Sequence, residues 1–450
     1  MIKYSNRLLI IIFILVVALS NNLFANDYQV PSTAQNLLSD KPVYPVTKFI
    51  IMSDTHYYNK SLGISGKAFQ KYLDNDRKLL VESDEILSTA INELNSIEAD
   101  FVIIPGDLTK DGERINHFEF AKKIKLLKDA GKKVFVVPGN HDVANGNSLR
   151  FEGDLTEAVP SVSGEQFPDI YSDFGYSASI ERDPGSLSYL VEPVPGLWLL
   201  ALDSCRWKEN KPDKHPITGG AFSKETLSWI ESMLIRSKTQ KKAVIAFMHH
   251  GIIEHYPSNE KFYGAYLVDN RDYVAKMMAE FGVSLVFTGH FHAQDIVKKE
   301  FGDRRNVIFD IETGSLVTAP CPYRIVSITK EQKAIIQSRF ISSIPSHPNE
   351  FAEYSDKYVF EGTLKLADKA LAKYRVSEND RVYINPQISK AYATHLKGDE
   401  VKPGQVLDTS NIGIWAKLIV YMQENLIYGW YTDLPPGDNQ LTIDLTNGTY

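Results

Sequence analysis

The 450-residue sequence contains only two cysteines, Cys205 and Cys321, and this scarcity excludes a fold held together by many disulfides. Basic residues are not in excess either, because 49 Lys and Arg stand against 56 Asp and Glu, a net charge of −7. That balance argues against a nucleic acid duplex as partner. The two cysteines can form one disulfide or remain separate thiols. Separate thiols are favoured because a disulfide needs Cα atoms within about 7 Å of each other.

The sequence also lacks an apolar run of about 20 residues, the length that crosses a membrane as a helix. Its longest run, residues 8–19, follows two basic residues and precedes a short polar stretch that ends at Ala25. This three-part layout is typical of a secretory signal peptide. We predict a signal peptide at residues 1–25 and export to the periplasm, the cell envelope or the medium, with no membrane span after cleavage. Leu23 is large for its place in a cleavage site, so an uncleaved N-terminal membrane anchor is the alternative.

Between residues 47 and 340, short apolar runs rich in Val, Ile and Phe alternate with amphipathic segments. The runs are four to eight residues long, which indicates buried strands of an α/β domain. Two stretches, 144–186 and 206–220, break this alternation and are predicted as long loops. Helices are predicted at residues 83–97, 116–130, 223–237 and 270–281, with Ser83, Asn116, Ser223 and Asn270 as N-caps.

The pattern of apolar and polar residues changes after residue 340. The stretch SSIPSHPNE has the composition of a linker, and helical periodicity follows at residues 351–374 and 412–428. We therefore predict a larger α/β domain at residues 26–342 and a smaller, mostly helical domain at residues 343–450. The second domain carries no recognisable chemical motif, so no protein partner is assigned to it.

Five clusters of polar residues stand at or just past the ends of the predicted strands. Ligands of open α/β sheets gather beyond the carboxyl ends of the strands, so the clusters are expected to form one site. The clusters are Asp54 and His56 in SDTH, Asp107 in GDL, Asn140, His141 and Asp142 in GNHD, His249 and His250 in MHH, and His290 and His292 in GHFH.

These side chains form a plausible set of metal ligands. Residues two apart on an extended segment point the same way, so Asp54 with His56, and His290 with His292, can each chelate an ion. Carboxylates, an amide oxygen and imidazoles suit Mn, Fe or Zn better than Ca, and seven ligands are too many for one catalytic ion. Two ions that share a carboxylate account for them. The remaining histidines lack such spacing and are predicted to be surface or structural residues: His117, His215, His255, His347 and His395.

The ordered set D-x-H, GDLTKDG, GNHD, HH and GHFH resembles the calcineurin-like metallophosphoesterase superfamily, in particular bacterial class III cyclic-nucleotide phosphodiesterases. The resemblance covers about residues 47–340 and implies a four-layer sandwich of two β-sheets flanked by helices. It also implies the roles of the site residues. Asp54, His56 and His292 would hold one metal ion, Asn140, His249 and His290 would hold the other, and Asp107 would bridge them.

In the same picture His141 lies against the substrate phosphate and donates a proton to the leaving oxygen, with Asp142 orienting it. The family commonly has Pro where Gly251 stands here, and this departure bears on the choice between His249 and His250. We favour His249 as the ligand because it occupies the first position of the motif. His250 is then expected to contact substrate or to support a ligand.

The function expected from these motifs is hydrolysis of phosphodiesters, with cyclic nucleotides favoured, by attack of a hydroxide that bridges two divalent or mixed-valence Mn, Fe or Zn ions. Protein Ser/Thr phosphatases carry GDxxDRG and GNHE, and purple acid phosphatases carry a Tyr where Lys110 stands, so both branches are excluded. A secreted phosphomonoesterase or nucleotidase is the first alternative. The second is an envelope binding protein on the same scaffold.

Overall fold

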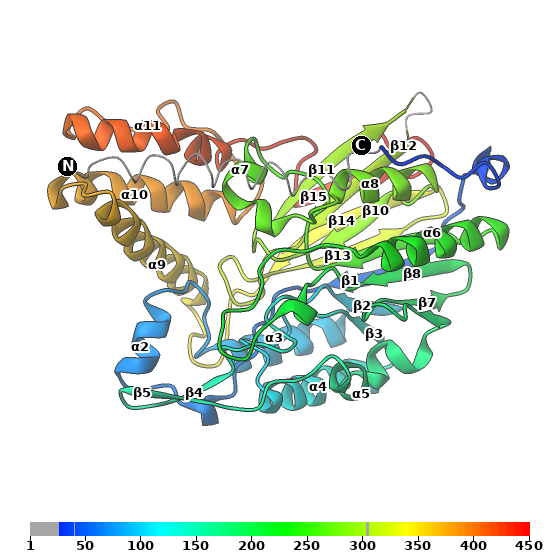
Figure 1. The fold of residues 1–450 in the computed structure, drawn as a ribbon, viewed down its shortest axis with the longest axis horizontal. Helices are drawn as coiled ribbons and strands as arrows, with labels where there is room; N and C mark the ends of the chain where they lie inside the picture. The colour runs from blue at the N-terminus through cyan, green and yellow to red at the C-terminus, as the bar shows by residue number, and fades with distance from the viewer. Residues whose placement is uncertain (1–26, 40, 303–305) are drawn as a thin grey trace, which may run out of the picture.

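The computed structural model describes residues 27–39, 41–302 and 306–450. The predicted signal peptide lies outside these residues and stays a prediction. Two β-sheets form the centre of the molecule (Figure 1). The six-stranded sheet has the order β15-β14-β13-β1-β2-β3, in which β1, β2 and β3 run parallel. Its strands are β1 (Thr47–Ile51), β2 (Phe101–Ile104), β3 (Lys133–Val136), β13 (Pro322–Ile328), β14 (Lys333–Phe340) and β15 (Gln440–Asp444).

The second sheet has seven strands in the order β11-β12-β10-β9-β8-β7-β6. Strands β8, β9, β10 and β12 run parallel, which places their carboxyl ends along one edge. The strands are β6 (Glu181–Arg182), β7 (Tyr189–Val194), β8 (Leu197–Leu202), β9 (Ala243–Met248), β10 (Leu285–Thr288), β11 (Asp295–Phe301) and β12 (Asn306–Glu312).

The two sheets pack face to face and are covered by helices on their outer faces. Strand β8, which is buried throughout, shows the arrangement. Leu197, Leu199 and Ala201 join the core between the sheets, whereas the alternate residues pack with helices α6 (Lys224–Thr239) and α8 (Arg271–Glu280). Phe49 of β1 meets Phe287 of β10 across the interface, with ring centroids 5.4 Å apart. The predicted four-layer α/β sandwich is therefore confirmed.

The covering helices are close to the predicted segments. Helices α3 (Ser83–Ser96) and α4 (Arg114–Asp129) lie on the six-stranded sheet, and α6 (Lys224–Thr239) and α8 (Arg271–Glu280) lie on the seven-stranded one. Ser223 caps α6 as predicted, because its side chain accepts a hydrogen bond from the Thr226 amide, and Asn270 occupies the cap position of α8.

Two of the four predicted caps are wrong. Ser83 and Asn116 lie inside their helices, and the cap positions belong to Glu82 and Glu113. Both side chains bind the loop after β1 instead: Ser83 accepts a hydrogen bond from the Tyr58 amide. Asn116 accepts one from the Asn59 amide. Tertiary contacts therefore override the local capping signal at both positions.

The stretch 144–186 is not only a loop. It contains the hairpin β4 (Leu149–Glu152) and β5 (Leu155–Ala158), and helix α5 (Gln166–Ile170) follows. The hairpin packs against α2 (Lys67–Leu73), and together they form a projection at one side of the sandwich (Figure 1). Helix α7 (Asn259–Tyr263) lies in the segment after β9.

The C-terminal region contains three helices, α9 (Phe351–Lys373), α10 (Glu378–His395) and α11 (Ile414–Gly429), and α10 packs between the other two (Figure 1). Helix α10 was not among the predicted segments, because its buried side chains are mostly small or polar and Pro386 lies inside it. The chain then returns to pair β15 with β14, so residues 440–444 belong to the six-stranded sheet and not to a helical domain. The boundary at residue 343 otherwise stays a prediction.

Cys205 and Cys321 are separate, buried thiols, in agreement with the favoured prediction. In residues 27–39, 41–302 and 306–450, no helix combines the length and apolar character needed to cross a membrane.

Candidate metal centre

The five polar clusters meet where the parallel strands of both sheets end. Asp54 and His56 follow β1, Asp107 follows β2, and Asn140 to Asp142 follow β3. From the other sheet, His249 follows β9, and His290 with His292 follow β10. The two sheets face each other, so their carboxyl edges bring residues from positions 54 to 292 into one place.

The backbone at this site is unusual. Asp54, His56 and Asp107 have φ angles of 50°, 35° and 48°. His290 and His292 have φ angles of 81° and 73°. This left-handed region costs a non-glycine residue about 1 to 3 kcal/mol, and such strain is typical of functional sites. The turns aim the side chains inward instead of letting them continue the alternation of a strand.

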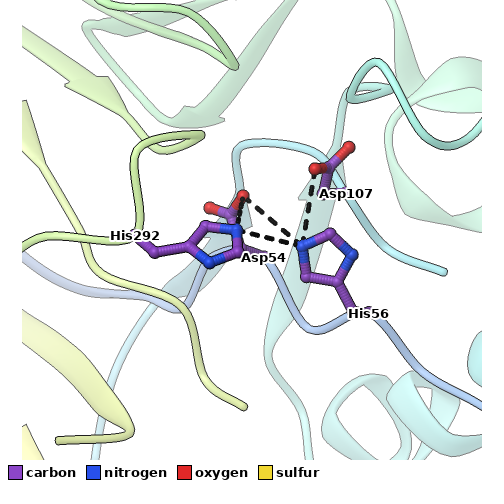
Figure 2. A group of neighbouring side chains, drawn as sticks. All are labelled: Asp54, His56, Asp107 and His292. Atoms are coloured by element: carbon purple, nitrogen blue, oxygen red, sulfur yellow. Dashed lines mark hydrogen bonds and ion pairs between the residues drawn. The ribbon is translucent and has the colours of Figure 1, made fainter. Parts of the chain in front are cut away.

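A first group of donors joins Asp54, His56, Asp107 and His292 (Figure 2). The Nε2 atoms of His56 and His292 face each other at 3.1 Å. The His292 Nε2 atom lies 3.4 Å from Asp54 Oδ1, and His56 Nε2 lies 3.5 Å from Asp107 Oδ2. All four residues therefore point one donor atom at the same small volume.

A second group contains Asp107, His249 and His290. The His249 Nε2 atom lies 3.4 Å from Asp107 Oδ2 and 3.1 Å from the amide oxygen of Asn140. Asp107 belongs to both groups, which is the position expected of a bridging carboxylate. The structure thus brings together all seven residues that the sequence predicted as metal ligands.

The chemistry of these donors fits two cations. Within the described residues, the buried Nε2 atom of His290 has no hydrogen-bond partner, so its lone pair is available. Burial would raise the pKa of Asp107, but the imidazoles of His249, His141 and His56 outweigh it and lower this pKa well below its ordinary value. Burial opposes protonation of His249, yet Asp107 raises its pKa to about 9. The Asp107 carboxylate therefore favours positive charge at this site.

His250 is not available as a ligand. Its Nδ1 atom lies 2.7 Å from the Ser204 hydroxyl and its Nε2 atom lies 2.8 Å from the Thr218 carbonyl oxygen. Burial, followed by the charge of His249, lowers its pKa to about 3, so the ring is neutral. The Nε2–H group donates to Thr218, and the structure agrees with the choice of His249 over His250.

His141 lies at the rim of the centre, with its Nε2 atom 4.0 Å from Asp107 Oδ2 and its Nδ1 atom 2.7 Å from Asp111 Oδ1. The expectation that Asp142 orients His141 is therefore wrong. The buried Asp142 carboxylate instead accepts hydrogen bonds from the amides of Leu108, Thr109 and Gly139, which fixes the loop behind Asp107.

Asp111 belongs to a buried ionic group that the sequence analysis missed. The Lys110 ammonium lies 2.5 Å from Asp111 Oδ2 and 3.0 Å from Glu113 Oε1. Burial alone would raise the pKa of Asp111, but Lys110 and His141 hold it well below its usual range. The available signal was the position of Asp111 in the same GDLTKDG motif as the bridging Asp107.

Gly139 makes the close packing of the centre possible. A Cβ atom at this position would lie 2.1 Å from Asp107 Oδ1 and 2.2 Å from the Asp107 amide nitrogen. Both contacts are too short for any side chain. The glycine of the GNHD motif is therefore required by the carboxylate beside it.

The centre opens into a cavity of about 770 Å³. An aromatic wall of Tyr263, Tyr266, Phe291 and Tyr392 lines one side, and the Tyr266 ring stacks on His290 with centroids 4.3 Å apart. Tyr392 comes from α10, so the C-terminal helices contribute to this cavity. Arg77 also lines the cavity, with its guanidinium carbon 4.1 Å from the centroid of the Tyr392 ring.

A model of the calcineurin-like phosphoesterase family matches residues 47–294, which include all seven candidate ligands. The chain belongs to this family. A search of curated proteins finds no significant match. The C-terminal helices lie beyond the part of the chain that the family model covers.

Several solved structures are similar in fold. A dimetal phosphatase from Danio rerio is 17% identical with a TM-score of 0.46, and the match covers 66% of this chain and 97% of that one. A purple acid phosphatase from Lupinus luteus is 14% identical with a TM-score of 0.42, covering 67% and 52%. The NAD nucleotidase of Haemophilus influenzae is 13% identical with a TM-score of 0.35, covering 68% and 51%.

Proposed function

We propose that this member of the calcineurin-like phosphoesterase family is a dinuclear metal-dependent phosphodiesterase and that cyclic nucleotides are its favoured substrates. The observation that carries the proposal is the pair of donor groups that share Asp107 beneath a large cavity. Asp54, His56 and His292 would hold one ion, and Asn140, His249 and His290 would hold the other. Ions of the Mn, Fe or Zn type, when bound, supply an activated water nucleophile and neutralise charge on the phosphoryl oxygens.

His141 is the proton donor in this proposal. Asp111 accepts a hydrogen bond from Nδ1–H, which fixes the ring so that Nε2 faces the centre. Burial opposes a charge on His141, but Asp107 and Asp111 outweigh this effect and raise its pKa. The ring can therefore carry a proton on Nε2 near neutral pH and pass it to the leaving oxygen of the substrate.

The cavity supports a nucleotide as substrate. An aromatic wall that begins at His290 can stack a planar base beside a phosphate held at the centre. The Arg77 guanidinium lies over the face of the Tyr392 ring. Within the described residues, this guanidinium makes no hydrogen bond or ion pair. Its N–H groups are thus free to bind phosphate or a base edge. The positive charge of Arg77 also favours a phosphomonoester, so a nucleotidase is the second candidate function.

The test is metal-dependent hydrolysis of matched substrates. Purified protein, stripped with chelator and reconstituted with Mn²⁺, is assayed with bis(4-nitrophenyl) phosphate and with 4-nitrophenyl phosphate, then with 2′,3′- and 3′,5′-cyclic AMP and with AMP. The proposal predicts a higher kcat/KM for the diesters and loss of activity in Asn140→Ala. A higher value for the monoesters would favour the nucleotidase, and metal binding without turnover of any substrate would favour a binding protein.

Export is part of the proposal and depends on the signal-peptide pattern alone. The expected result is a processed protein whose N-terminus follows Ala25, as determined by mass spectrometry of the extracytoplasmic fraction. An intact N-terminus in a membrane fraction would favour the anchored alternative.

A further inference from the structure

A second group of metal-binding side chains lies where the C-terminal helices meet the catalytic sandwich. Asp295 begins β11, three residues after His292, and His395 ends α10. Donor atoms of Asp295, His395 and Glu400 all lie within 4.8 Å of one another, and all three residues are buried. We call these three residues the junction site. The Gln294 amide donates to the Leu396 carbonyl oxygen at 3.2 Å, so the backbone of both segments is joined at the same point.

Two polar atoms of the junction site have no hydrogen-bond partner in the part of the chain that the structure describes. The Nδ1 atom of His395 lies 2.5 Å from Glu400 Oε1, and both side chains are 1% exposed. The other atoms of this pair, His395 Nε2 and Glu400 Oε2, are buried and find no such partner among the described residues. Buried carboxylate oxygens are normally satisfied, so the second oxygen of Glu400 points to a missing ligand.

Further carboxyl groups lie close to the junction site. Asp399, Asp433 and Asp438 form an adjoining group of carboxylates. Burial, followed by the charge of Asp295, raises the pKa of Asp438 to about 9. Burial, followed by the charges of Glu400 and Asp295, raises the pKa of Asp433 to about 7. Burial and mutual repulsion therefore disfavour the ionised form of these carboxyl groups, and a bound cation would favour it.

The basic side chains close to this group are already engaged. His255 lies 3.1 Å from Asp295, 3.3 Å from Asp310 and 3.7 Å from Glu312, so one imidazole faces three carboxylates. The buried Arg324 guanidinium donates to the carbonyl oxygens of Asp438 and Glu312, which are neutral acceptors. Neither residue neutralises Glu400.

An ordinary ion pair between His395 and Glu400 would explain their short contact. It would not explain the unpartnered oxygen of Glu400 or the approach of Asp295 to the same point. A cation bound by all three residues explains these observations together. Two carboxylates and one imidazole form a donor set typical of Zn²⁺ or Mn²⁺.

We propose that Asp295, His395 and Glu400 bind a divalent cation of the Zn²⁺ or Mn²⁺ class. This ion is separate from the catalytic centre and joins the loop of His290 and His292 to the end of α10. Because such a site exists only in the folded protein, the free energy of metal binding stabilises the folded state. The C-terminal helices are thereby held against the catalytic sandwich at the point where Tyr392 enters the cavity.

The experiment measures metal binding and does not depend on the proposed function. The full-length protein is stripped with chelator, dialysed against Zn²⁺ and analysed for zinc per chain. The variant Asp107→Ala, which removes the bridging carboxylate, weakens binding at the catalytic centre and serves as the background. Adding Glu400→Gln, a change of one atom, is expected to lower the zinc content of this variant by one ion per chain. Glu378→Gln, a change at the exposed glutamate that begins α10, serves as the matched control and keeps the ion.

A second measurement needs no variant. Crystals of the wild-type protein grown with Zn²⁺ are expected to show an anomalous peak between Asp295, His395 and Glu400. Equal zinc content of the Asp107→Ala protein with and without Glu400→Gln, or the lack of an anomalous peak at the junction site, would overturn the proposal. Absence of phosphoesterase activity in a wild-type protein that holds the junction ion would count against the catalytic proposal only.

Discussion

The contact between Asp111 and His141 gives the sharpest prediction about the chemistry. Replacing Asp111 with Asn keeps the shape of the side chain but removes the charge that lies 2.7 Å from His141 Nδ1. Hydrogen bonds to charged groups contribute about 1.5 to 3 kcal/mol, and each 1.36 kcal/mol is about tenfold in rate. We expect kcat to fall about 10- to 100-fold for a substrate whose leaving oxygen needs a proton.

The assay compares two leaving groups. The ribose oxygen of 2′,3′-cyclic AMP needs a proton to leave, whereas 4-nitrophenolate leaves readily as an anion, so Asp111→Asn should slow only the first reaction strongly. Tyr72→Phe is the matched control, because it removes the hydroxyl that donates to Asp111 Oδ2 at 3.1 Å and keeps the carboxylate. Equal losses for both substrates, or no loss for either, would refute the role of Asp111 in positioning a proton donor.

Three further predictions follow from single residues. Gly139→Ala places a methyl group 2.1 Å from Asp107 Oδ1, so we expect at least about 100-fold lower kcat/KM with an unchanged circular dichroism spectrum; wild-type activity would contradict the packing. Burial lowers the pKa of His117 from the ordinary 6.5 to about 4. The unfolded chain therefore binds a proton at a higher pH than the folded protein does, and the free energy of unfolding decreases as pH falls below 6.5. Urea unfolding should show that this free energy decreases by about 3 kcal/mol between pH 7 and pH 4. The decrease should be absent in His117→Gln and retained in the control His215→Gln, at an exposed histidine. Equal acid sensitivity of both variants would contradict the assignment of the lowered pKa to His117. Arg77→Ala should raise KM for nucleotides about tenfold or more. An equal rise for bis(4-nitrophenyl) phosphate would indicate a contact with phosphate and a smaller rise a contact with the base, whereas an unchanged KM for both substrates would exclude a role in substrate recognition.

The fold could be predicted from the sequence because its strands are buried on both faces. Continuous apolar runs such as LWLLAL in β8 are typical of such strands, and the polar residues that follow them mark the carboxyl edge. Helix α10 escaped prediction because it buries Asn385, Ser389 and His395, which no apolar periodicity reveals. Strand β15 escaped because its pairing with β14 depends on a return of the chain over about 100 residues.

The candidate ligands could be predicted from their spacing, but the contacts around them could not. Asp142 adjoins His141 in the sequence, yet the turn after β3 directs its carboxylate to backbone amides behind Asp107. Asp111 lies 30 residues away and reaches His141 only because β2 and β3 are parallel neighbours. Arg324 is fully buried and donates to the carbonyl oxygens of Asp438 and Glu312, which its place in the sequence does not indicate. Side-chain partners of this kind depend on the folded topology.

We propose that two ions share Asp107 at the ends of the parallel strands. Anomalous diffraction from crystals soaked in Mn²⁺ can locate both ions. We expect one peak on each side of Asp107, the first beside Asp54, His56 and His292 and the second beside Asn140, His249 and His290. A single peak, or peaks that Asp107 does not join, would contradict it.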